Sequence, residues 1–189
     1  MRVLVIDNVD LFTYNLVDEL EKKECEVLVY GNVDMKTIDN VVKAFKPKLI
    51  VISSGAADEP GISIDVVRAY QGQIPIFGVG LGMHFVIKAF EGKATKSAAS
   101  RASLAKISHD GKTIFKALED NFEAGVYNTL SALDVPYSFE VSARNENDVV
   151  MGIRHKESFI EGIQFDPSSL LTISGSLIID NLLKEIGKK

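Results

Sequence analysis

The sequence predicts an α/β protein in which a parallel sheet carries helices on both faces. Two observations lead to this prediction. In the first half of the chain, short aliphatic runs alternate with segments whose apolar residues recur every three to four positions. Such alternation is typical of β-α-β units, whose helices cover both faces of the sheet. The 189 residues contain no internal repeat or low-complexity linker, so a single domain over residues 1–189 is expected.

The N-terminal half is expected to alternate strands with helices. In the first helix, Phe12, Leu16 and Leu20 recur every four residues, and Asp10 is suited to cap the helix N-terminus. Strands are expected at residues 3–6, 26–30, 49–52 and 74–77, and helices at residues 11–23, 34–45, 62–70 and 81–90. Ligands of such sheets bind beyond the carboxyl ends of the strands, which directs attention to residues 7–10, 53–61 and 80–84.

The C-terminal half changes character. Residues 95–118 are polar and hairpin-like, and residues 109–112 are expected to form a turn that leaves His109 exposed to solvent. Further strands are expected at residues 137–143, 149–154 and 159–165. A final helix is expected at residues 175–186, because Ile178, Leu182 and Ile186 recur every four residues and lie on one face.

Composition and charge exclude several classes of function. A formal net charge of −5 argues against a nucleic-acid platform, which usually carries a basic face. No apolar run approaches the ~20 residues that a membrane span needs, and no signal peptide is visible, so a cytoplasmic location is expected. The three histidines are scattered and Cys25 is the only cysteine, so neither a metal site nor an intramolecular disulfide is expected.

The most informative motif lies at residues 74–82, where a strand runs through a tight turn into a helix. Gly78 and Gly82 flank Gly80, which is the layout of a nucleophile elbow that raises a Ser or Cys above a sheet. Gly80 has no side chain, so the motif indicates either a lost nucleophile or a ligand that approaches the backbone closely. A dinucleotide loop is disfavoured because the spacing is not Gly-x-Gly-x-x-Gly, and no cofactor is expected. An anion at the N-terminus of the following helix remains reasonable.

Several local strings resemble class I glutamine amidotransferases, and most closely the anthranilate synthase component II subgroup. The resemblance covers essentially the whole chain, and its strings lie at residues 6–16, 61–63, 74–78, 109–112, 151–157 and 160–165. It implies a flavodoxin-like fold with a mostly parallel central sheet and a small antiparallel sheet. It also implies a glutaminase in which a Cys attacks glutamine, a His takes the thiol proton, a Glu orients the His, and ammonia passes to a synthase partner.

The chain departs from this family at the positions that carry the chemistry. Gly80 stands at the Cys position, and Asp166 and Ser168 stand where the family has His and Glu. At the positions that the resemblance assigns to the oxyanion loop and the glutamine pocket, the residues are Gly55, Ala56, Leu81, His84, Arg101, Asn128 and Thr129. Backbone donors at Gly55 and Leu81 can still survive. His84 and Asp166 are either a new acid–base pair or a packed helix residue and a solvated loop residue, and the second interpretation is favoured.

The string that follows the first strand keeps its resemblance to the family. In anthranilate synthases this junction faces the synthase subunit, so an interface role is expected for Asn8, Asp10, Phe12, Tyr14 and Asn15. A helix cap and core packing explain part of the same pattern. The main hypothesis is a subunit without glutaminase activity that binds an anthranilate-synthase-like large subunit. The alternative is a small-ligand sensor that binds an amino acid or an anion in the former glutamine pocket.

Overall fold

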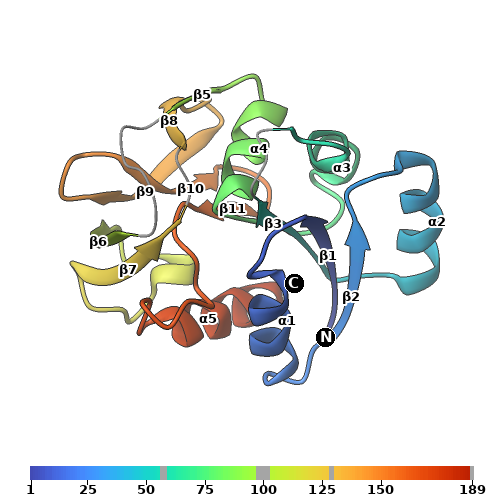
Figure 1. Cartoon of the computed structure of the whole chain (residues 1–189), viewed down its shortest axis with the longest axis horizontal. Helices are drawn as coiled ribbons and strands as arrows, with labels where there is room; N and C mark the ends of the chain where they lie inside the picture. The colour runs from blue at the N-terminus through green and yellow to red at the C-terminus, as the bar shows by residue number, and fades with distance from the viewer. Residues whose placement is uncertain (56–58, 97–102, 128–129, 188–189) are drawn as a thin grey trace.

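The structure, a computed structural model, describes residues 1–55, 59–96, 103–127 and 130–187. Within these residues, nine strands form one sheet in the order β2-β1-β3-β4-β11-β10-β9-β6-β7, and β5 and β8 form a second sheet (Figure 1). The strands are β1 Arg2–Asn8, β2 Glu26–Gly31, β3 Leu49–Gly55, β4 Ile76–Val79, β5 Lys93–Lys96, β6 Ser103–His109, β7 Phe122–Val126, β8 Leu130–Asp134, β9 Phe139–Asn145, β10 Val150–His155 and β11 Ile160–Ile163. The helices are α1 Thr13–Glu21, α2 Met35–Phe45, α3 Ser63–Tyr70, α4 Leu81–Ala89, α5 Gly175–Gly187 and the short 3-10 helix η1 Thr113–Phe115.

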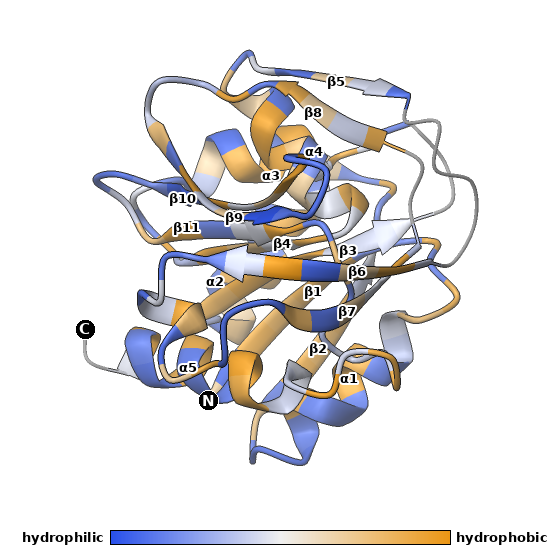
Figure 2. Ribbon diagram, turned by 90° about the vertical axis from the view of Figure 1, so that its left-hand side faces the viewer, coloured by the Kyte–Doolittle hydropathy of each residue, from blue (hydrophilic) through white to orange (hydrophobic). Residues whose placement is uncertain are grey.

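The parallel part of the sheet is buried on both faces, as the alternation of elements predicts. Strands β2, β1, β3, β4 and β11 pair in parallel. Val3 and Val5 of β1 belong to the core under α1 and α5, whereas Leu4 and Ile6 belong to the core under α2, α3 and α4. Both faces therefore demand apolar side chains, and β1 is an unbroken aliphatic run. Figure 2 shows this apolar interior beside the hydrophilic outer faces of α1 and α5.

The second half of the chain extends the sheet with antiparallel strands, and β5 pairs with β8 in the small antiparallel sheet. The turn expected at residues 109–112 does not close a hairpin within residues 95–118. It leads from β6 into η1, and β6 pairs with β9 and the later β7. His109 is half-buried rather than exposed, because its ring stacks on Phe115 with centroids 5.1 Å apart and also contacts Phe122.

Helix α4 is enclosed almost completely. Every residue of Leu81–Ala89 is buried except Lys88, which is half-buried. A helix that is apolar around its whole circumference must be covered on all sides, and α4 packs against β3, β4, α3 and the small β5–β8 sheet (Figure 1). No helix among the described residues is both long enough and apolar enough to cross a membrane.

Candidate functional site

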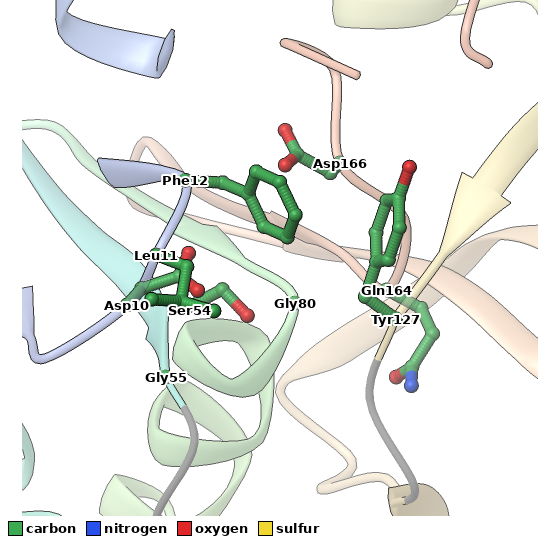
Figure 3. A pocket seen from close by; sticks show the side chains of 9 residues that line it. All are labelled: Asp10, Leu11, Phe12, Ser54, Gly55, Gly80, Tyr127, Gln164 and Asp166. Atoms are coloured by element: carbon green, nitrogen blue, oxygen red, sulfur yellow. The ribbon is translucent and has the colours of Figure 1, made fainter. Parts of the chain in front are cut away.

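A pocket of about 210 Å³ opens at the carboxyl edge of the parallel strands, where the order of elements predicts a ligand site. It lies between the β1–α1 connection, the end of β3, the β4–α4 turn and the segment after β11 (Figure 3). Its lining residues are Asp10, Leu11, Phe12, Ser54, Gly55, Gly80, Tyr127, Gln164 and Asp166. Gly55, Gly80 and Asp166 were expected at this site, and the structure brings all three to the pocket.

The β4–α4 turn has the backbone of a nucleophile elbow. Gly80 precedes α4 with φ 57° and ψ −115°, a conformation that residues with a side chain rarely adopt. The flanking glycines allow the close packing of the turn, because a Cβ at Gly82 would clash with the carbonyl oxygen of Ile52. The Gly80 amide donates to the Ile163 carbonyl at 2.8 Å, which ties the turn to β11. The elbow therefore keeps its shape without a nucleophilic side chain.

Asp166 and Ser168 bond to each other. Oδ1 of Asp166 accepts from the backbone amide of Ser168 at 2.8 Å and from its hydroxyl at 2.7 Å. Asp166 is 7% exposed, and burial raises the pKa of its carboxyl. The solvated loop position considered for Asp166 is wrong, because its side chain is buried and hydrogen-bonded to Ser168. An Asp held in this way differs from an imidazole that a third group orients toward a thiol.

The backbone donors of the expected oxyanion region lie in a crowded environment. The Leu81 amide, at the start of α4, faces the hydroxyl oxygen of Ser54 at 3.5 Å. Gly55 passes close to β1, since a Cβ there would lie 2.7 Å from the Asn8 carbonyl oxygen. Four other residues expected at the pocket lie outside the described residues: Ala56, Arg101, Asn128 and Thr129.

His84 lies away from this chemistry. It is fully buried within α4 and is not among the residues that line the pocket. The hydrogen bonds to the Asp166 carboxylate come from Ser168, so the structure does not form a His84–Asp166 acid–base pair. Among the described residues, His84 is therefore a buried residue of α4 outside the lining of the pocket.

Asp10 is a wall of the pocket and not the cap of α1. The helix begins at Thr13, and the preceding residue, Phe12, makes no side-chain cap hydrogen bond. Oδ1 of Asp7 instead accepts from the amides of Val9 and Asp10 and from the hydroxyl of Thr13, which shapes the β1–α1 connection. Burial raises the pKa of the Asp10 carboxyl, and the negative charge of Asp166 raises it further.

Two aromatic side chains complete the wall above Gly80. The rings of Phe12 and Tyr127 have centroids 5.1 Å apart and are tilted by 38°. The Tyr127 hydroxyl lies 2.6 Å from Oγ of Ser169 and is thereby linked to the segment after β11. Tyr127 and Gln164 were not among the residues expected to line the pocket. Tyr127 directly precedes Asn128 and Thr129, which were expected there, and it reaches the pocket from the end of β7.

Asn8 organises the strand ends beneath the pocket. Its amide nitrogen donates to the Ser53 carbonyl at 2.7 Å, and its oxygen accepts from Asn32 at 2.6 Å and from Ser63 at 2.8 Å. Asn8 is 5% exposed, so its side chain is not on the surface where an interface role was expected. Tyr14 and Asn15, by contrast, are exposed on α1.

Comparison with known proteins identifies the family. Residues 4–186 match the model of the family described as glutamine amidotransferase class-I. The chain belongs to this family. Aminodeoxychorismate synthase component 2 of Escherichia coli is 38% identical to this amidotransferase-family chain over 186 residues, covering 96% of the chain and 98% of the relative. Anthranilate synthase component II of Haloarcula marismortui is 39% identical over 193 residues, covering 97% and 91%.

Two solved structures share the fold of this chain. A glutamine amidotransferase from Thermotoga maritima superposes with a TM-score of 0.76, at 13% identity, covering 100% of this chain and 99% of the other. A GMP synthase-type protein from Thermoplasma acidophilum superposes with a TM-score of 0.85, at 21% identity, covering 100% and 98%. At these identities the likeness concerns the fold alone. The predicted fold and family are confirmed, and the chain is a glutamine amidotransferase-like protein similar to anthranilate synthase component II.

Proposed function

We propose that this chain is a non-catalytic small subunit that binds and supports or regulates an anthranilate-synthase-like large subunit, which uses free ammonia. One observation carries the proposal: the elbow keeps its backbone conformation with Gly80 at its apex, and Asp166 and Ser168, at the positions that the resemblance assigns to the base and the orienting group, bond to each other. Glutamine hydrolysis by this family needs a thiolate and a base within hydrogen-bond reach of it. Gly80 supplies no thiol, and Asp166 and Ser168 supply no imidazole.

The one cysteine of the chain does not replace the missing nucleophile. Cys25 lies immediately before β2, at the amino end of the parallel strands, whereas the pocket lies at their carboxyl ends. Burial raises the pKa of the Cys25 thiol, which opposes formation of the reactive thiolate. Its sulfur lies 3.9 Å from the Lys23 carbonyl oxygen in the same connection.

Exposed apolar side chains near the pocket support a protein partner. On the β1–α1 side, Val9, Leu11 and Tyr14 are 81%, 90% and 68% exposed, and Leu11 also lines the pocket. In the segment that follows Asp166, Leu170 and Ile173 are 99% and 90% exposed. Large exposed apolar side chains in the two segments that supply pocket residues are what an interaction surface would use. Both relatives above carry names that mark them as second components of a synthase.

Two measurements test the proposal. Glutaminase activity is measured with and without a synthase large subunit from the same source, and co-elution of the two chains is followed by size-exclusion chromatography. We expect no glutamine turnover and a stable complex. Leu11→Arg and Leu170→Arg should weaken the complex, whereas Tyr137→Arg should not. Tyr137 is 92% exposed and contacts Lys156, which follows β10 at the amino edge of the parallel strands, opposite the pocket. Turnover that depends on Asp166, or no association with any large subunit, would contradict the proposal.

The pocket favours a second candidate function, that of a small-ligand sensor. A space of about 210 Å³ remains open above the elbow even though the residues of the former chemistry are replaced. Saturable thermal stabilisation by one metabolite, in the absence of a large subunit, would support the sensor function; stabilisation by none would favour the subunit role alone.

A further inference from the structure

The two edges of the nine-stranded sheet differ in how the chain covers them. At the β7 edge, the Gly125 amide donates to the Thr172 hydroxyl and the Gly125 carbonyl accepts from the Asp166 amide, both at 3.0 Å. The segment after β11 therefore covers the outer side of β7. At the opposite edge, β2 pairs with β1 alone among the described strands.

The β2 edge is open although its strand is mostly apolar. Residues 27–30 of β2 are half-buried, whereas Val3, Leu4, Val5 and Ile6 of the neighbouring β1 are 0% exposed. An open edge is a template for another strand, and proteins usually protect such edges with lysine, proline or a β-bulge. The strand contains no lysine or proline and pairs with β1 without a register shift, so none of these devices is present in β2.

The backbone groups on the open side of β2 can be identified from the bonds on its other side. The amides of Glu26 and Asn32 donate toward β1, to the carbonyl oxygens of Met1 and Asp7 at 2.8 and 3.1 Å. Backbone groups alternate in direction along a strand, so residues 28 and 30 also face β1, and residues 27, 29 and 31 face outward. The outward groups of residues 27 and 29 bond to no other described residue.

A second copy of the chain fits this edge by symmetry. A twofold axis perpendicular to the sheet makes two β2 strands antiparallel and keeps each face of the sheet on its own side. Outward residues must then lie opposite outward residues. A register centred on Val29 pairs Val29 with its own copy and Val27 with Gly31. The same register places Leu28 opposite Tyr30, an aliphatic–aromatic pair of the kind that stabilises antiparallel strands.

The charge on β2 allows two copies to approach. Glu26 is the only charged residue of the strand, and in this register it lies opposite Asn32 of the copy. The two Glu26 side chains are then about 20 Å apart along the strands, beyond the screening distance of about 8 Å at physiological ionic strength. No pair of like charges meets across the axis within β2.

The helix beside β2 is also free of charge on the side that would meet the copy. Asp39 of α2 faces the inner strands, because it accepts a hydrogen bond from the Tyr70 hydroxyl of α3. At about 100° per residue, the opposite flank of α2 carries three uncharged side chains: Thr37, Val41 and Ala44. The lysines at positions 36 and 43 lie between these two flanks and are exposed.

We propose that the chain forms a twofold-symmetric dimer in which two β2 strands pair antiparallel about Val29 and join the two sheets into one. The dimer goes beyond the proposed subunit role and does not depend on the loss of glutaminase chemistry. Its interface is the edge of the sheet at β2, whereas the pocket lies between the β1–α1 connection, β3, the β4–α4 turn and the segment after β11.

Sedimentation velocity of the chain without any large subunit tests the proposal. We expect a species with twice the mass of one chain that dissociates on dilution. Val29→Pro should raise the dissociation constant at least about tenfold, because both backbone hydrogen bonds of the central pair are lost. The monomer should keep its circular dichroism spectrum, since proline is tolerated in an edge strand where the lost N–H faces solvent.

Disulfide cross-linking tests the register, and it still decides if Val29→Pro fails to fold. In a Cys25→Ser background, Val29→Cys carries the only thiol, and its Cα atoms lie about 5.5 Å apart across the axis, within the range of a disulfide. Leu28→Cys is the matched control, because residue 28 is also half-buried but its two Cα atoms lie about 8 Å apart. We expect a covalent dimer under oxidising conditions for Val29→Cys and none for Leu28→Cys.

A monomer at every concentration would overturn the inference, as would a dissociation constant that Val29→Pro leaves unchanged. Equal cross-linking of the two cysteine variants, or preferential cross-linking of Leu28→Cys, would contradict the register and with it the proposed dimer. Each of these outcomes leaves the proposed subunit role standing. That role fails instead on glutamine turnover or on lack of association with a large subunit, so the two failures are distinguishable.

Discussion

A cysteine placed at Gly80 should not restore glutaminase activity. The cleanest protein for this test is Cys25→Ser combined with Gly80→Cys, because the new thiol is then the only one in the chain. A side chain at φ 57° and ψ −115° costs about 1–3 kcal/mol in backbone strain. For a domain of this size each kcal/mol lowers Tm by about 2–4 °C, so Tm should fall by roughly 2–12 °C relative to Cys25→Ser alone.

The electrostatics of the pocket oppose activation of the new thiol. Asp10 and Asp166 line the same space, and their negative charges disfavour a thiolate, so the thiol pKa should lie above the ordinary value of about 8.5. The pH dependence of iodoacetamide labelling measures that pKa. Further replacement of Asp166 by His and Ser168 by Glu should increase any glutaminase rate by about 10²–10⁴, the usual contribution of a positioned base. Glutamine turnover by the cysteine variant alone, at the rate of the fully substituted one, would refute this reasoning.

Three further predictions concern the scaffold. Burial raises the pKa of Glu161 to about 7, so the native state binds this proton more tightly than the unfolded chain does. The free energy of unfolding should therefore fall by about 3 kcal/mol as pH rises from about 4.5 to 7. Urea denaturation at several pH values should show a smaller fall in Glu161→Gln. Gly82→Ala should lower the free energy of unfolding by about 3 kcal/mol because of the clash with Ile52, whereas Gly187→Ala, which has nothing within 4 Å, should change it little. Asn8→Ala should cost about 2–3 kcal/mol in chemical denaturation, since it leaves Ser53, Asn32 and Ser63 without their shared partner; a loss below about 0.5 kcal/mol would contradict the role given to Asn8.

The sequence predicted those features that depend on local pattern. The aliphatic run of β1 reveals a strand buried on both faces, and the glycines around Gly80 reveal a tight turn before α4. The place of the pocket followed from the order of strands and helices. One failed prediction concerned a local contact, and the others depended on contacts between distant segments. Asp10 was expected to cap α1, and Asp7 took over the local hydrogen bonds instead.

Contacts between separate segments explain the aromatic residues. His109 was expected in an exposed turn, but Phe115 and Phe122 come from segments beyond that turn and cover its ring. The contact between Phe12 and Tyr127 joins the β1–α1 connection to the end of β7, across more than half the chain. No periodicity within a window of a dozen residues carries that information, because the pairing is decided only when the sheet assembles.

The enclosure of α4 determines which parts of the pocket can adjust. The floor is the start of a helix buried on every side, and moving it would disturb the sheet, α3 and the small β5–β8 sheet together. The walls are less constrained, because Phe12 comes from a connection and Asp166 from an irregular segment. Closely packed interiors resist displacement, whereas loops open locally at little cost. If ligands of different size bind, the side chains of the walls should therefore move, while the start of α4 should keep its position.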